Sequence, residues 1–189
     1  MTKTALLIMD VLAGMVPRIP NLSPSYLSLM ASTIAAARSS SIKIIYVTIA
    51  FRPTHPEISP SNLAFAAAAK GNAFLVGSPA VEVHPSIAPH EGDIVVVKKR
   101  VSAFTGSDLE VILRSLDVKT LVLAGMSTGG VVLSTLSEAA DKDYGLVVLR
   151  DLCVDPNEEV HRVLMDQIFP KRGNVTGAEE WVKGLQSEA

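Results

Sequence analysis

The sequence predicts an α/β fold with a mostly parallel β-sheet that helices cover on both faces. Short runs of apolar, β-branched residues alternate with longer segments whose apolar side chains recur at helical spacing. The short runs are apolar almost throughout, as is typical of strands buried on both faces of a parallel sheet. The chain has 189 residues, which suits one hydrophobic core, so we expect a single domain over residues 1–189.

Five strands are expected, and a polar or glycine residue follows each of them directly, except after the second, where Phe51 precedes Arg52. Because the carboxyl ends of parallel strands lie at one edge of a sheet, these residues are expected to share that edge. The predicted strands are residues 4–9, 42–50, 94–97, 120–124 and 145–149.

Amphipathic helices are expected between the strands and after the last one. The first, residues 21–40, carries Ser23 as its cap and Pro24 as its first helical residue. Asp155 and Pro156 are expected to cap the helix after the fifth strand. The other helices are expected at 61–70, at 108–116, from Val131 onward, and at 178–186.

Composition narrows the classes of partner. A net charge of −2 argues against binding to nucleic acid or to anionic membranes, and leaves a small molecule as the expected partner. Apolar residues make up 48% of the chain and the mean hydropathy is +0.34, so we expect a homo-oligomer, a dimer or tetramer, that covers some apolar surface.

Signals that the sequence lacks narrow the expected cellular compartment and the expected type of reaction. A single cysteine, no signal-peptide pattern and no bilayer-length apolar stretch predict a cytoplasmic protein. The chain has no metal-type Cys/His spacing, no dinucleotide- or phosphate-binding glycine motif and no G-x-S-x-G nucleophile motif. We therefore expect neither a cofactor nor a metal.

Two charged residues at strand ends are candidates for chemistry. Asp10 ends the first apolar run, although an aspartate there is also a common turn cap. Lys98, Lys99 and Arg100 end the third run. Side chains alternate along a strand, so Lys98 enters the crevice if Lys99 faces solvent, the alternative being a solvated charge run.

The turn after the fourth strand is the expected ligand site. Met126 to Gly130 supplies two hydroxyls and two glycines just before the helix that starts at Val131. Free N–H groups and the helix dipole at such a turn favour ligand binding, although the segment also suits an ordinary strand–helix unit.

A proline-rich loop follows the second strand and is expected to cover the site. It runs from Phe51 to Pro60 and carries Arg52 and His55. We expect both to contact a polar or anionic substrate, the alternatives being a solvated arginine and a turn histidine.

Three segments together resemble the isochorismatase-like hydrolase superfamily, which includes isochorismatases, nicotinamidases and N-carbamoylsarcosine-type amidohydrolases. The resemblance covers nearly the whole chain. The first segment is Ala5–Asp10, a strand that ends in an acid. The second is Lys98–Phe104, which begins with a lysine and ends with Ser-Ala-Phe. The third is Thr120–Ala140, which contains the pattern L-x-L-x-G-x-x-T.

This resemblance implies a Rossmann-like, three-layer α/β/α fold with a six-stranded sheet. It implies that Asp10 and Lys98 are catalytic, and that Phe104 contacts substrate. It also implies a non-proline cis peptide at Met126–Ser127 that turns backbone N–H groups toward the substrate. The backbone groups expected at an oxyanion are those of Met126, Ser127, Thr128, Gly129, Gly130 and Val131.

The sequence departs from the cysteine hydrolases of this superfamily at one position. Val131 stands where those enzymes carry the nucleophilic cysteine, and a valine cannot attack a carbonyl. Cys153 falls at the end of the next strand, away from the helix N-terminus that would activate a thiol. His55 also lacks the Asp-x-His pattern of the nicotinamidase metal site.

The resemblance therefore favours an isochorismatase-like hydrolase that uses Asp10 and Lys98 without a covalent intermediate. Hydrolysis of a vinyl ether or related C–O bond fits these residues, with an isochorismate-type substrate. The first alternative is an inactive small-molecule-binding or regulatory protein. The second is an amidase with Ser127 or Thr128 as nucleophile, for which the sequence shows no histidine base.

Overall fold

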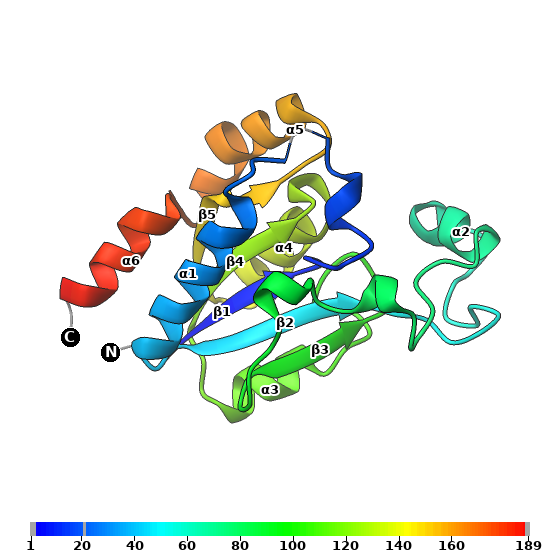
Figure 1. Cartoon of the computed structure of the whole chain (residues 1–189), viewed down its shortest axis with the longest axis horizontal. Helices are drawn as coiled ribbons and strands as arrows, with labels where there is room; N and C mark the ends of the chain where they lie inside the picture. The colour runs from blue at the N-terminus through cyan, green and yellow to red at the C-terminus, as the bar shows by residue number, and fades with distance from the viewer. Residues whose placement is uncertain (1–2, 21, 188–189) are drawn as a thin grey trace.

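A computed structural model describes residues 3–20 and 22–187 and shows a six-stranded, all-parallel sheet in the order β3-β2-β1-β4-β5-β6 (Figure 1). The α/β fold expected from the sequence is confirmed. The strands are β1 (Thr4–Met9), β2 (Lys43–Ile49), β3 (Ile94–Lys98), β4 (Thr120–Met126), β5 (Gly145–Val154) and β6 (Asn174–Thr176).

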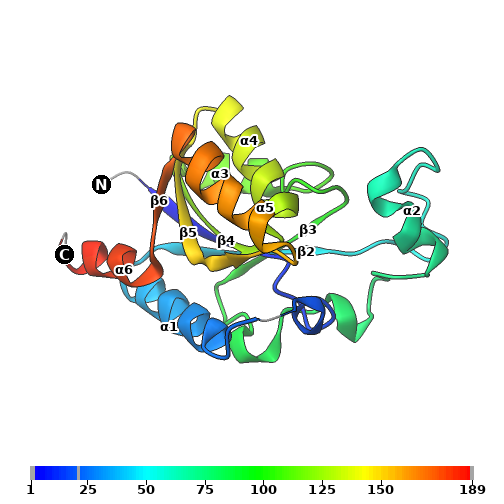
Figure 2. The ribbon, with the colours of Figure 1, turned by 90° about the horizontal axis from the view of Figure 1, so that it is seen from above.

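Helices cover both faces of the sheet, and one helix stands apart. In Figure 2, α1 (Tyr26–Ser39) and α6 (Ala178–Ser187) lie on one face, while α3 (Leu109–Ser115), α4 (Leu133–Asp141) and α5 (Glu158–Val163) lie on the other. The remaining helix, α2 (Leu63–Lys70), projects from the body beyond the carboxyl ends of β2 and β3. None of the helices in the described part of the chain is long and apolar enough to cross a membrane.

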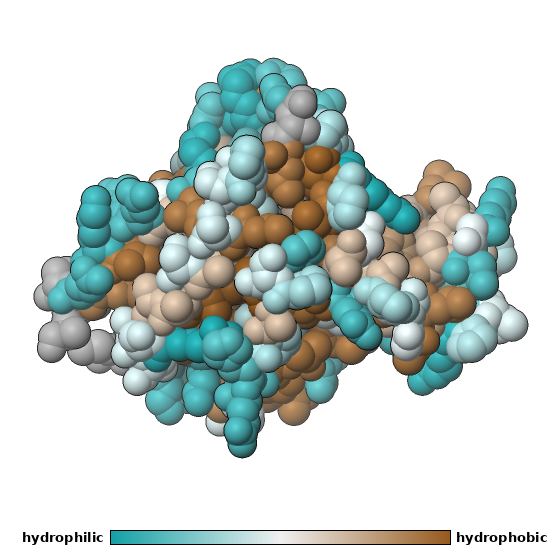
Figure 3. Space-filling view, viewed as in Figure 1, coloured by the Kyte–Doolittle hydropathy of each residue, from teal (hydrophilic) through white to brown (hydrophobic). Residues whose placement is uncertain are grey.

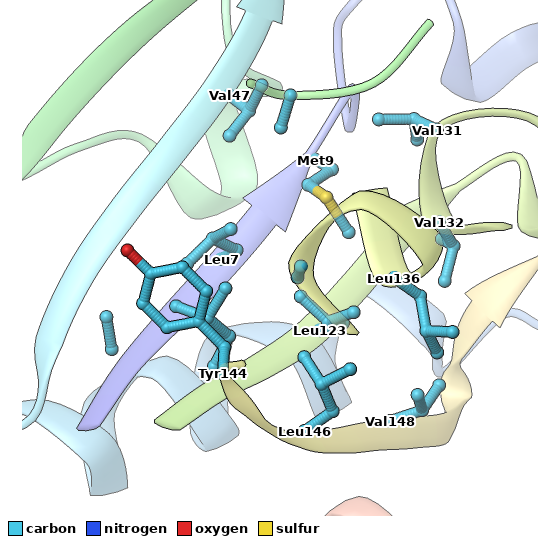
Figure 4. Close-up of a cluster of buried hydrophobic side chains, with 14 of the residues drawn as sticks. Leu7, Met9, Val47, Leu123, Val131, Val132, Leu136, Tyr144, Leu146 and Val148 are labelled. Atoms are coloured by element: carbon cyan, nitrogen blue, oxygen red, sulfur yellow. The ribbon is translucent and has the colours of Figure 1, made fainter. Parts of the chain in front are cut away.

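The core is divided between the two faces of the sheet by the alternation of side chains. Leu7 and Met9 of β1 face α4, whereas Leu6 and Ile8 pack against α1. Figure 4 shows the first of these layers, where Leu136 of α4 points toward the sheet. Full burial of one such side chain contributes about 1.5–3 kcal/mol, so the central strands anchor the fold.

The sheet extends further than the apolar runs predict. Strand β5 continues to Val154, where Cys153 pairs with Gly125 after a shift of register, although we predicted its end at Leu149. The exposed charges of Arg150 and Asp151 interrupt the apolar pattern without ending the strand. Strand β6 has only three residues, and none of them is buried, so no apolar run marks it.

Helix starts also differ from the prediction. Helix α1 begins at Tyr26, because Ser23 and Pro24 form a turn ahead of it in which Ser23 Oγ accepts the N–H of Ser25 (3.3 Å). Asn21, where we predicted this helix to begin, lies outside the described residues. Helix α5 is capped by Asn157, whose Oδ1 accepts the N–H of Glu159 (3.0 Å), so Asp155 is left for another contact.

Candidate active site

The carboxyl ends of β1, β3 and β4 open into a cavity of about 450 Å³. Parallel pairing aligns Met9 with Val47 and Ile49 with Lys98, which brings Asp10 and Lys98 to the same edge of the sheet. The residues that line this cavity include Asp10, Lys98, Met126, Ser127, Gly130 and Val131. Three separate segments singled out in the sequence therefore meet in one cavity.

Asp10 and Lys98 form a buried ion pair at the base of this cavity. Lys98 Nζ lies 2.9 Å from Asp10 Oδ2, and the two side chains are 2% and 8% exposed. Lys98 Nζ also donates a hydrogen bond to the carbonyl of Arg100 (3.0 Å). The other carboxyl oxygen, Asp10 Oδ1, is buried and has no hydrogen-bond partner within the described residues. A buried oxygen without a hydrogen bond destabilises the folded protein unless a ligand supplies the missing partner.

The environment of Asp10 makes its proton harder to remove than that of a solvent-exposed aspartate. Burial raises the pKa of the Asp10 carboxyl above its ordinary value, and the positive charge and hydrogen bond of Lys98 oppose that rise. Since Oδ2 faces Lys98, Oδ1 is the atom that can give a proton to a bound molecule or take one from it.

The neighbouring cations point elsewhere. Lys99 Nζ donates to the carbonyl of Ala50 and lies 6.0 Å from the centre of the Phe51 ring. Arg100 donates to the carbonyl of Glu57 (2.9 Å). Neither residue lines the cavity, so Lys98 is the member of the charge run that enters it.

The turn between β4 and α4 contains a cis peptide bond at Met126–Ser127. A π-helical turn, Thr128–Val132, then leads into α4, so helical backbone begins earlier than the predicted Val131. Two turn amides are occupied. Gly129 N–H donates to Asp155 Oδ2 (2.7 Å) and Gly130 N–H donates to the carbonyl of Ser127 (3.1 Å).

This accounting corrects the set of expected oxyanion donors. The N–H groups of Gly129 and Gly130 are already bonded, although we expected both to face a ligand. The N–H of Ser127 has no acceptor within the described part of the chain, and Ser127 lines the cavity. The Ser127 N–H is thus available to bind an oxygen of a ligand.

Helix α5 packs directly behind this turn. His161 Nδ1 lies 2.8 Å from Thr128 Oγ1, so a histidine does neighbour a hydroxyl here, contrary to the sequence-based expectation. Thr128 is fully buried and does not line the cavity. A β-carbon added at Gly129 would lie 2.9 Å from Val160 Cγ1, which shows how closely helix and turn approach. The contact between Thr128 and His161 therefore holds the turn against α5.

The local environment keeps His161 neutral. Burial and the nearby Arg150 lower the pKa of the His161 imidazole, while Asp155 and Asp166 oppose that effect. A neutral imidazole can accept the hydrogen of the Thr128 hydroxyl at Nδ1, whereas a protonated one cannot.

Three residues that we expected to contact substrate do not line the cavity. Arg52 is exposed and pairs with Glu57 (2.8 Å), and His55 is buried with its Nε2 2.7 Å from the carbonyl of Ala73. Phe104 packs in the core, its ring 6.1 Å from that of Tyr144. The His55 ring lies beside that of Phe51, with 5.7 Å between their centres, so this side chain is held within the loop.

Other lining residues were missed by the sequence reasoning. Ala64, Ala67 and Ala68 of α2 form one wall, and Met15 and Arg18 come from the segment after β1. An alanine-rich helix carries no chemical signal, and the short turn Val16–Arg18 has no periodic pattern. Only proximity to Asp10 in the sequence could have suggested Arg18.

Cys153 lies away from the cavity in the β4–β5 ladder. It is buried, and burial raises the pKa of its thiol to about 12. A thiol with that pKa is inert near neutrality. Among residues 3–20 and 22–187, no three His, Cys, Asp or Glu side chains gather as they would around a metal ion.

The parallel sheet, the buried Asp10–Lys98 pair and the cis peptide at Met126–Ser127 agree with the features that the resemblance implies. The isochorismatase domain family matches residues 4–180, and the chain belongs to this family. It is a small-molecule hydrolase.

Individual relatives match this chain over almost its full length. The chain is 26% identical to maleamate amidohydrolase of Pseudomonas putida over 97% of its own length and 87% of the relative's. It is 29% identical to the isochorismatase family protein YwoC of Bacillus subtilis, covering 97% and 95% of the two chains. A cysteine hydrolase from Pseudomonas syringae shares the fold with a TM-score of 0.88 at 21% identity, covering 99% and 94%.

Proposed function

We propose that this hydrolase uses Asp10 as a general acid or base and forms no covalent intermediate through a cysteine. The observation that carries the proposal is the buried Asp10–Lys98 pair at the cavity, in which Asp10 Oδ1 has no hydrogen-bond partner in the described structure. A positioned carboxyl of this kind contributes roughly 10² to 10⁴ in rate.

A vinyl ether of the isochorismate type is the substrate class that suits this acid. Asp10 gives its proton to the terminal carbon of the vinyl group, and the ether oxygen stabilises the cation that results. Water then adds to the cationic carbon and returns a proton to Asp10. Cleavage of the C–O bond in the hemiketal releases an alcohol and a ketone, so the net reaction consumes one water.

Lys98 and Ser127 have supporting roles in this proposal. Lys98 holds Asp10 Oδ2, so that Oδ1 is presented to the substrate, and its charge stabilises the carboxylate left after proton transfer. The Ser127 N–H binds an oxygen on which negative charge develops when the hemiketal collapses.

Val131 is the residue that separates this proposal from thiol-based amide hydrolysis. Its side chain lines the cavity at the position that we assign to the nucleophile of the cysteine hydrolases. Amidohydrolases stand among the relatives, but the buried Cys153 is out of reach of the cavity and Thr128 does not line it. Ser127 does line the cavity, but the histidine beside the turn contacts the Thr128 hydroxyl rather than that of Ser127. These placements favour acid–base chemistry over a nucleophile supplied by the chain.

The pH dependence of hydrolysis tests the proposal. Isochorismate and maleamate are each incubated with the protein and followed by ¹H NMR. If Asp10 acts as an acid, kcat/KM falls as the pH rises through the raised pKa of Asp10, because the proton is then lost. A rate that increases over the same range assigns Asp10 as the base. A flat profile, or no hydrolysis of either compound, contradicts the proposal.

A further inference from the structure

Arg18 lies beside the cavity on a segment whose backbone is held by contacts with a second segment. The chain between Asp10 and the turn Val16–Arg18 pairs with a second segment: Leu12 bridges to Val83, and Gly14 N–H donates to the carbonyl of Ala80 (3.1 Å). A β-carbon on Gly14 would lie 2.7 Å from that of Ala80, so the two segments are in close contact. The backbone that carries Arg18 is therefore fixed with respect to the cavity.

The guanidinium of Arg18 has no partner in the described part of the chain. It makes no ion pair and no side-chain hydrogen bond there, whereas Arg38 pairs with Asp93 and Arg150 pairs with Asp166. An exposed arginine can remain hydrated, but this one lines the wall of a cavity. Its five donors are available to a bound molecule.

The charges and walls of the cavity single out one kind of molecule. Lys98 and Arg18 are both positively charged, and Asp10, the other ionisable lining residue within the described structure, can offset at most one of these charges. Apolar side chains such as Met15, Phe74 and those of α2 make up most of the remaining wall. The cavity thus has a net positive charge, and its apolar walls strengthen the attraction to an anion.

We propose that Arg18 binds a carboxylate of the substrate, and that the site accepts small carboxylic acids with an apolar body. Asp10 is buried and Arg18 is exposed, so the carboxylate is held near the opening while the reacting group reaches Asp10. A planar guanidinium matches a carboxylate in a paired, two-bond geometry. Arg18 is then a specificity-determining residue and takes no part in proton transfer. This inference rests on the proposed function for the identity of the reacting end.

Binding of matched acid and amide probes tests the inference without turnover. Benzoate and benzamide have nearly the same shape and differ in charge, and both are small enough for a cavity of about 450 Å³. Calorimetry at low salt is expected to show benzoate binding about fivefold more tightly than benzamide to the wild-type protein. Arg18→Gln is expected to remove this preference and leave benzamide binding unchanged, while Arg18→Lys retains part of it.

The control is Arg52→Gln, an exposed arginine paired with Glu57 away from the cavity, which should keep the wild-type preference. Equal binding of the two probes by the wild-type protein overturns the inference. A preference that survives in Arg18→Gln also overturns it, because Lys98 would then be the anion's partner. Inorganic phosphate lacks an apolar body, so tighter binding of phosphate than benzoate contradicts the stated class. If the wild-type protein prefers benzoate but hydrolyses neither isochorismate nor maleamate, the proposed function is rejected and the inference about Arg18 stands.

Discussion

At the scale of the residue, each group of the site owes its behaviour to its burial and to one close partner. Asp10 has one oxygen on Lys98 and one without a partner in the described structure, while burial raises its pKa. Cys153, equally buried, has a raised thiol pKa and no access to the cavity. The same desolvation thus prepares one group for proton transfer and makes the other inert.

His161 is expected to make stability depend on pH. Its folded-state pKa is lowered, so the unfolded chain binds the proton more readily, and stability falls as the pH drops below about 6.5 toward the folded-state pKa. His161→Asn keeps an acceptor near Thr128 but cannot titrate. Urea unfolding at several pH values should show a smaller loss of stability on acidification in this variant. The exposed His90→Asn is the control, and an unchanged slope in His161→Asn would reject the role of His161.

Val131→Cys tests the assignment of position 131, in a Cys153→Ser background that leaves one thiol. The new thiol would lie in the cavity with Asp10 and Lys98, where the positive charge of Lys98 lowers its pKa. Iodoacetamide is expected to label it at least about tenfold faster at pH 7 than it labels Cys153 in the wild-type protein. Slow maleamate hydrolysis that labelling abolishes is the second expected result. A thiol that reacts no faster than Cys153 refutes the assignment.

At the scale of the element, the sequence predicted the strands that a local pattern of side chains marks. The apolar runs of β1 and β4 and the polar residues that follow them are visible without coordinates. Strand β6 and the extension of β5 were missed because backbone pairing with a neighbour, rather than an apolar run, defines them. The position of α2 was missed because its packing through Phe65 depends on contacts distant in the sequence.

Gly125 provides an element-scale prediction, because it holds β4 against β1. Its φ is +146°, and an added β-carbon would lie 2.1 Å from the carbonyl oxygen of Met9. Gly125→Ala is expected to destabilise the protein by about 3 kcal/mol in urea unfolding, since backbone must move. Gly184→Ala in α6, where an added β-carbon meets no atom, should instead stabilise by about 0.5–1 kcal/mol. Equal effects of the two substitutions would contradict this account.

At the scale of the whole molecule, the exposed large apolar side chains of the described residues lie together in two places, whereas Val111 and Val160 are exposed singly on other helices. One is the alanine-rich α2 and the chain after it, where Leu63 is 87% and Val76 61% exposed, and which forms the pale brown surface at the right of Figure 3. The other is the edge strand β3, through Val95 and Val97. The helix after Val131 directs most of its apolar side chains into the core (Figure 4), so it offers little apolar surface to a partner.

We therefore expect a homodimer or larger assembly that covers α2. Light scattering after gel filtration should report at least twice the chain mass of 20.1 kDa at micromolar concentration. Leu63→Asp should shift this mass toward the monomer, because it places a charge in the apolar surface. Lys70→Gln, at the end of the same helix, serves as the control. A wild-type monomer would exclude the assembly.

The most direct test of the central claim is the rate of substrate hydrolysis by Asp10→Asn and by wild-type protein treated with iodoacetamide. Asn is close to Asp in shape but cannot transfer the proton, so the rate should fall by at least about 10². The treated wild-type protein should keep its rate, because the buried Cys153 thiol has a pKa of about 12. Circular dichroism confirms that both samples remain folded. Retained activity in Asp10→Asn, or loss on alkylation of a folded protein, would contradict the proposed mechanism.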